Sequence, residues 1–148
     1  MKHVLLAMSL VMTATAFAQQ PAAPAAQTEP AFKAHVLSRA EFDVLLKHPE
    51  KLLVIDVRRP YELTAIGGFP VYLSIQQSDL ESSLAWIPKD RTIVTVSNHA
   101  ARAGKAADLL AAKGFKVAGA VGAQLYEKDG GTLTKLTPPP SPADPAAK

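Results

Sequence analysis

Two short runs of apolar, mostly β-branched residues place the strongest constraint on how this chain folds. They are Leu52–Asp56 (LLVID) and residues 92–96 (TIVTV), and each has the length and composition of a strand buried on both faces. The second run leads into residues 101–113, where apolar residues recur with helical spacing up to Gly114. Such alternation favours an α/β domain with a parallel sheet and helices on both faces.

Weaker signals predict the remaining elements. Ser38 and Glu41 form a capping box, which marks the start of a helix before the first strand. The single tryptophan, Trp86, is expected to pack at a helix end. The other expected elements are strands over residues 71–75 and 115–121 and a short helix over residues 78–86.

The two ends of the chain differ in composition from its middle. Residues 1–18 have the positive start, short apolar stretch and small-residue cleavage site of a secretory signal peptide; an uncleaved N-terminal anchor is the alternative. Residues 19–31 are a Pro/Ala linker, and residues 137–148 are a Pro-rich tail that is expected to be disordered. The folded domain is therefore predicted at residues 32–136. The mature protein is expected to be exported, and periplasmic if the source is Gram-negative.

Composition excludes several classes of function. The chain contains no cysteine, so it has no disulfide, thiolate nucleophile or zinc–thiolate site. Its histidines show no metal-ligand spacing, and we expect neither a metal nor a cofactor. The formal charge is +3 and the basic residues are scattered, which argues against nucleic-acid binding. No stretch after the signal is long enough for stable membrane insertion.

The loop between the second strand and its helix lies where a parallel sheet places ligands, beyond the carboxyl ends of the strands. The loop consists of Ser97, Asn98, His99, Ala100, Ala101 and Arg102. Free N–H groups and the positive end of the helix favour a bound anion there. If Arg102 turns inward, the expected affinity for sulfate, phosphate or thiosulfate is about millimolar. The alternative is an ordinary strand-to-helix connection with a solvated arginine.

The surrounding residues show a wider pattern. Asp56, Arg58 and Glu62 follow the first strand, and Arg102 begins the helix that carries Ala-Ala-Asp-Leu-Leu before Gly-Phe-Lys-Val. This pattern resembles the rhodanese domain family over nearly all of residues 32–131. The resemblance implies an active loop at residues 97–102. It also implies that Asp56, Arg58 and Glu62 form structural ion pairs.

Ser97 stands where that family carries its catalytic cysteine. A serine hydroxyl cannot form the persulfide through which such enzymes transfer sulfur, and it needs an adjacent base to become a nucleophile. Ala100 replaces a glycine of the family's loop, and alanine at positive φ costs about 1 kcal/mol, which leaves the shape of the loop open. The sequence thus predicts a catalytically degenerate rhodanese-like domain. It would act as a binding or regulatory module for an unknown protein partner or a small anion.

Two alternatives remain at this point. The chain is an enzyme of another class if Ser97 serves as the nucleophile of a hydrolase or phosphatase-like enzyme on a small anionic ester. That mechanism needs a base, such as His99, within about 3.2 Å of the hydroxyl. The second alternative is a stable domain whose tails carry the interaction.

Overall fold

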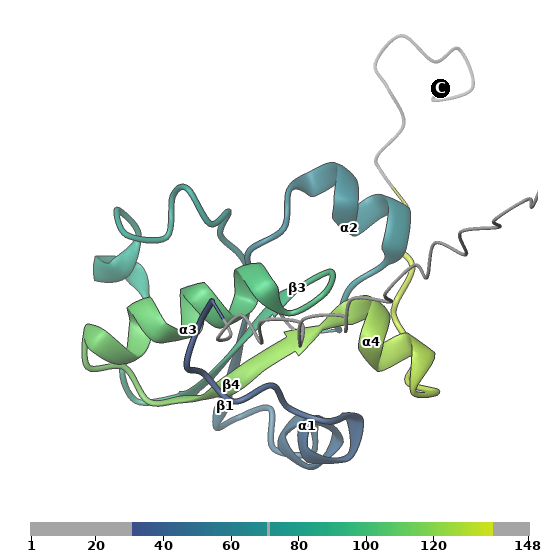
Figure 1. Cartoon of the computed structure of the whole chain (residues 1–148), viewed down its shortest axis with the longest axis horizontal. Helices are drawn as coiled ribbons and strands as arrows, with labels where there is room; N and C mark the ends of the chain where they lie inside the picture. Colours follow the sequence, from purple (N-terminus) through teal and green to yellow (C-terminus); the bar gives the residue numbers. More distant parts are fainter. Residues whose placement is uncertain (1–30, 71, 138–148) are drawn as a thin grey trace, which may run out of the picture.

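Four parallel strands form the centre of the computed structural model, which describes residues 31–70 and 72–137 (Figure 1). The strands are β1 (Leu52–Asp56), β2 (Leu73–Ser74), β3 (Thr92–Ser97) and β4 (Val117–Gly122), in the order β2-β1-β3-β4. In register, β3 pairs Val94 with Val54 of β1 and Val96 with Val121 of β4. The predicted signal peptide, most of the linker and nearly all of the tail lie outside the described residues.

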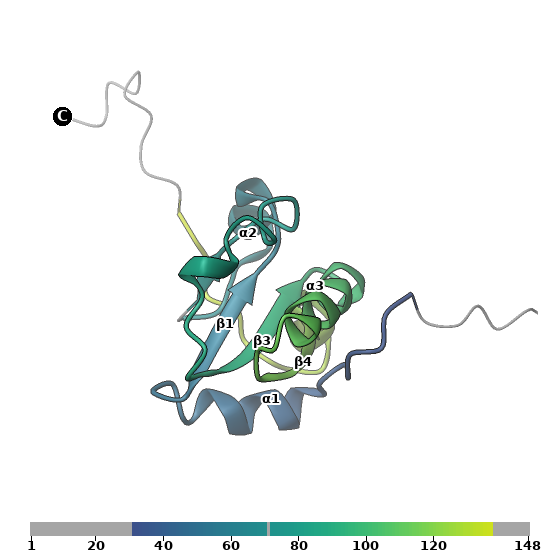
Figure 2. The same ribbon diagram turned by 90° about the vertical axis from the view of Figure 1, so that its left-hand side faces the viewer.

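Helices cover both faces of this sheet, as predicted, and the arrow of β1 points toward α2 (Figure 2). Neighbouring residues of a strand point to opposite faces, so Val54 packs with α1 and α4 whereas Ile55 packs with α3. None of the described helices is long and apolar enough to cross a membrane. The helices are α1 (Arg39–Leu46), α2 (Pro60–Ile66), the 3-10 turn η1 (Leu84–Trp86), α3 (Ala101–Ala112) and α4 (Ala123–Lys128).

Several sequence predictions are confirmed in detail. The hydroxyl of Ser38 accepts a hydrogen bond from the Glu41 N–H, and the Glu41 carboxylate accepts one from the Ser38 N–H, which completes the capping box of α1. The helix predicted over residues 101–113 is α3. Gly114, with φ of +81°, follows its C-cap Lys113 in the left-handed conformation that favours glycine.

Other sequence predictions are wrong or inexact. Residues 78–86 do not form a helix but a series of turns that ends in η1. The hydroxyls of Ser82 and Ser83 both donate to the carbonyl of Asp79, and such local bonds compete with helix formation. Trp86 therefore does not pack at a helix end and is 84% exposed. Strand β2 is limited to Leu73–Ser74 and β4 begins later than expected, while α2 and α4 are additional.

Three aromatic rings form the centre of the core on the α1 side of the sheet. Phe42 of α1, Phe69 and Tyr126 of α4 meet edge to face, with ring centroids 4.9–5.8 Å apart. The Tyr126 hydroxyl donates to Asp43 at 2.6 Å, so its polar end is satisfied. The cluster holds both helices against β1, β3 and β4.

We predict that Phe42→Ala lowers the free energy of unfolding by about 3–5 kcal/mol, because it opens a cavity at a ring that is fully buried. The matched control is Trp86→Ala, which removes a larger but exposed ring and is expected to change stability by less than about 0.5 kcal/mol. Urea denaturation followed by circular dichroism measures both. Equal losses in the two variants would contradict this assignment of the core.

Candidate functional site

The connection from β3 to α3 is a tight loop at the carboxyl end of the sheet. Ala100 has φ of 67° and ψ of −22°, which is a left-handed conformation, and it is 3% exposed. An alanine in this region costs about 1 kcal/mol relative to the ordinary helical region. The sequence left the shape of the loop open at Ala100. In the structure this residue has a positive φ, and the backbone is strained there.

The beginning of α3 presents unpaired backbone N–H groups. None of the described residues accepts a hydrogen bond from the N–H groups of residues 98–102. The N-cap residue is Ala100, whose methyl group cannot accept one either. Unpaired N–H groups together with the positive end of a twelve-residue helix form an environment that stabilises an anion.

Ser97 lies beneath this loop and is 1% exposed. Its hydroxyl accepts a hydrogen bond from the Ala103 N–H at 3.2 Å, so it takes the capping role that Ala100 cannot fill. His99 is exposed, and in the described part of the chain neither ring nitrogen hydrogen-bonds to the Ser97 hydroxyl. The geometry that the Ser97-dependent enzyme requires is therefore not present between these two residues.

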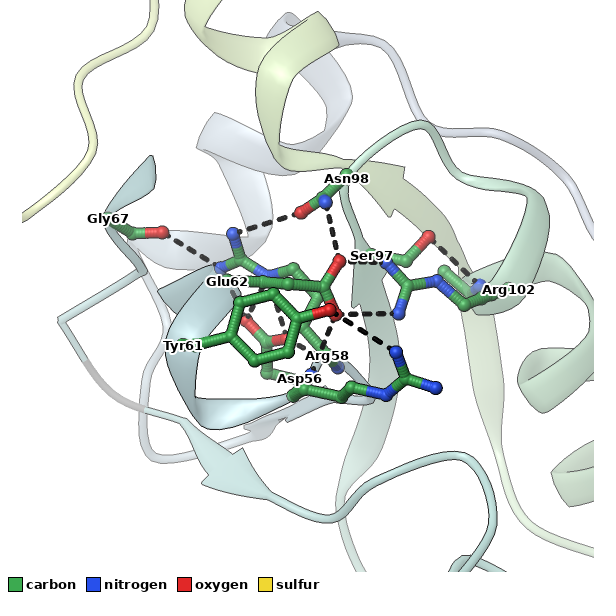
Figure 3. Close-up of polar contacts among 10 residues, drawn as sticks. Asp56, Arg58, Tyr61, Glu62, Gly67, Ser97, Asn98 and Arg102 are labelled. Carbon is green, nitrogen blue, oxygen red and sulfur yellow. Dashed lines mark hydrogen bonds and ion pairs between the residues drawn. The ribbon is translucent and has the colours of Figure 1, made fainter. Parts of the chain in front are cut away.

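Glu62 connects α2 to the loop (Figure 3). Its carboxylate accepts two hydrogen bonds from the Arg102 guanidinium, at 2.8 and 2.5 Å, and one from the Asn98 amide at 2.7 Å. It also accepts the Arg59 N–H at 2.9 Å, which caps α2. Arg102 is therefore directed onto Glu62, and its positive charge is compensated there.

These contacts change the protonation of Glu62. The hydrogen bonds from Arg102 are the largest cause, and they hold the pKa of Glu62 at about 2, below its usual 4.5, although partial burial opposes the shift. The same pairing raises the pKa of Arg102 above its usual value. The Glu62–Arg102 pair is thus ionised throughout the neutral range.

A second ion pair lies beneath the first and is fully buried. Arg58 donates to the Asp56 carboxylate through its Nη2 at 2.7 Å and through its Nε at 2.9 Å. Arg58 also donates to the Gly67 carbonyl at 2.9 Å, and its Nη1 lies 3.5 Å from the Asn98 amide oxygen. Asn98 therefore bridges the two ion pairs, a role that the sequence did not indicate.

Comparison with solved structures identifies the fold. A rhodanese-related protein from Thermoplasma volcanium matches with a TM-score of 0.60 and 21% identity, over 71% of this chain and 100% of that chain. A rhodanese-like domain protein from Staphylococcus aureus matches with a TM-score of 0.52 and 21% identity, over 59% of this chain and 84% of that chain. The chain has a rhodanese-like fold.

A third match involves a longer protein. Reduced CoADR-RHD from Bacillus anthracis matches with a TM-score of 0.57 and 28% identity, over 65% of this chain and only 17% of that chain.

No family model matches the sequence, and no curated protein matches it. The rhodanese-like domain described here contains no cysteine, so sulfur transfer through a cysteine persulfide is impossible within this chain.

Sequence reasoning missed the other polar groups at this end of the sheet. Arg59 follows β1, and Gln76, Gln77 and Ser78 follow β2; with Val57 and Arg102 they line a pocket of about 310 Å³. The rule that ligands lie beyond the carboxyl ends of parallel strands could have indicated them, had β2 been placed accurately. No group of three or more His, Asp or Glu side chains among residues 31–70 and 72–137 is placed to hold a metal ion.

We predict that Ala100→Gly stabilises the rhodanese-like domain by about 0.5–1 kcal/mol, because glycine adopts a positive φ without strain. The control is Ala111→Gly in α3, an exposed helical site where the same change should destabilise by about 0.5–1 kcal/mol. Thermal and urea denaturation measure both. A loss of stability in Ala100→Gly would show that the loop is not strained.

We also predict that Glu62 stabilises the folded state only while it is ionised. Its pKa is depressed on folding, so the stabilisation is complete above the unfolded value of about 4.5 and is lost as the pH falls toward 2. Wild type should exceed Glu62→Gln by on the order of 2 kcal/mol at about pH 6, allowing for solvent screening around the partly exposed Arg102.

The difference should approach zero near pH 2 when urea denaturation is repeated across this range. The control is Glu81→Gln, which breaks an exposed pair with Lys113 and should have a small effect at every pH. An undiminished difference at low pH would contradict the assigned role of the Glu62 charge.

Proposed function

We propose that this rhodanese-like domain is a non-catalytic binding module that holds a small oxyanion at residues 97–102. The observation that supports the proposal most directly is the set of unpaired N–H groups of residues 98–102 at the start of α3. These donors persist although the cysteine is absent, because Ala100 retains a left-handed conformation. The loop thus keeps the electrostatic character of an anion site without a nucleophile.

The buried hydroxyl of Ser97 argues against catalysis at this loop. Its oxygen already accepts the Ala103 N–H, and the two carboxylates of the cluster are occupied: that of Glu62 by Arg102 and Asn98, and that of Asp56 by Arg58. A serine needs a free base to become a nucleophile. The Ser97-dependent hydrolase or phosphatase-like activity therefore has no supporting contact.

The expected affinity for a simple anion is weak. Arg102 contributes little net charge because Glu62 compensates it, so backbone N–H groups and the helix end supply most of the attraction. That combination suggests dissociation constants of about millimolar or weaker for sulfate. A physiological ligand then needs further contacts beside the loop, or a protein partner that carries the anionic group.

Export remains part of this proposal on sequence grounds alone. The N-terminal pattern of residues 1–18 supports secretion, and residence in the periplasm follows if the source is Gram-negative. Non-covalent binding in that compartment does not require a cysteine. The module could also be regulatory and bind an unknown protein partner. The tails at the two ends of the chain could contribute to that binding.

Titration of ¹⁵N-labelled protein with sodium sulfate, at constant ionic strength, tests the proposal. We expect amide shifts confined to residues 98–103 with a dissociation constant of about millimolar. Glu62→Gln should tighten binding several-fold, because it removes a negative charge and releases the Arg102 guanidinium. Arg102→Ala should weaken it, because Glu62 is then left uncompensated beside the loop.

The absence of shifts at about 50 mM sulfate would contradict the proposal, since even the backbone donors alone should give partial saturation at that concentration. Shifts that are spread over the surface would indicate general ionic effects. Sodium chloride at the same ionic strength serves as the control for that outcome.

A further inference from the structure

A second polar hollow adjoins the loop, on the β2 side of the same sheet edge. It encloses about 310 Å³ and is formed where the chain leaves β1 and β2. Its lining consists of Val57, Arg59, Gln76, Gln77, Ser78 and Arg102. Arg102 is the only one of these residues that belongs to the 97–102 loop.

The arginines around this hollow differ in their ion-pair partners. Asp56 pairs with Arg58 and Glu62 pairs with Arg102, so each of these two guanidinium groups has its carboxylate. Arg59 forms no ion pair with any described residue; its guanidinium donates to the hydroxyl of Tyr61 at 3.2 Å. Among the described residues, Arg59 is therefore the arginine of this hollow that has no ion-pair partner.

Arg59 also lies close to a second positive charge. The hydrogen bond that Arg59 donates to Tyr61 is the main reason why the pKa of Arg59 is raised; the nearby charge of Glu62 also raises it, and the charge of Arg102 opposes the shift more weakly. Arg59 has guanidinium N–H groups that an oxyanion in the hollow could accept, and Arg102 lines the same hollow although Glu62 compensates its charge. Such an arrangement favours carboxylate and phosphate groups.

The lining of the hollow also carries side-chain amides. Gln76 and Gln77 are partly buried, and within residues 31–70 and 72–137 neither side chain has a hydrogen-bond partner. Each amide offers donors and an acceptor to a ligand. The Ser78 hydroxyl donates to Asp79, which leaves its oxygen free to accept. This wall suits hydroxyl or amide groups on the body of a ligand.

We propose that this pocket binds a small organic oxyanion, with its phosphate or carboxylate group between Arg59 and Arg102 and its polar body against Gln76 and Gln77. The pocket is distinct from the backbone site proposed for the loop, and it does not depend on that site. Its amide groups would favour an organic anion with a polar body over sulfate or inorganic phosphate.

Glycerol 3-phosphate, glycerate and inorganic phosphate are suitable probes, because the first two share a hydroxylated body and differ in the oxyanion. Each is titrated into ¹⁵N-labelled full-length protein, and the side-chain amides of Gln76 and Gln77 are followed. We expect glycerol 3-phosphate or glycerate to shift these amides and to bind at least about fivefold more tightly than inorganic phosphate. The probe that binds identifies which oxyanion the pocket takes.

Arg59→Gln should weaken binding of the preferred probe by about tenfold or more. Arg59 is exposed, and its backbone N–H bond to Glu62 is retained in the variant, so folding should be preserved. The control is Arg91→Gln, at the amino-terminal end of β3, which should leave binding unchanged. Gln77→Ala should lower affinity for the organic probe but not for inorganic phosphate.

Equal affinity for the organic probes and inorganic phosphate would overturn the proposal, as would binding that is insensitive to Arg59→Gln. Shifts that appear only at residues 98–103 would likewise overturn it while leaving the loop site intact. Conversely, shifts at Gln76 and Gln77 without a response of the loop would support the pocket and count against the loop. The two proposals can thus fail separately.

Discussion

The buried ion pair between Asp56 and Arg58 is the interaction on which the carboxyl end of the sheet depends. Both side chains are fully removed from solvent, so each charge is tolerated only because the other compensates it. Arg58 uses its remaining donors on the Gly67 carbonyl, at the end of α2, and lies near the Asn98 amide of the loop. One guanidinium therefore connects β1, α2 and the β3–α3 loop.

A second layer of polar contacts rests on that pair. Glu62 joins Arg102 and Asn98, and Asn98 links this layer back to Arg58. The network explains how the loop can hold Ala100 at a positive φ, because strain of about 1 kcal/mol persists where surrounding contacts determine the backbone. This framework is present in a chain that has no cysteine. The left-handed conformation of the loop therefore does not require a cysteine at its start.

Fold and function are correspondingly separate in this chain. The match to rhodanese-like structures describes the sheet and its helices, whereas function depends on the groups at the sheet edge. Those groups are backbone donors, an arginine paired with Glu62 and one without an ion pair among the described residues, and the described contacts place no base on the Ser97 hydroxyl. This set of groups is the basis of the proposed binding of a negatively charged ligand.

Local patterns in the sequence determined β1, β3, α1 and α3, because a buried β-branched run, a capping box and an alanine-rich helical repeat are encoded over a few neighbouring residues. The position of the β3–α3 connection and the absence of cysteine were also readable from the sequence. Other features were decided only by tertiary structure. Arg102 faces Glu62, forty positions away, because the parallel register of β1 and β3 brings their ends together. The exposure of Trp86 and the convergence of Arg59 with Gln76 and Gln77 likewise depend on how distant segments pack, which no local pattern specifies.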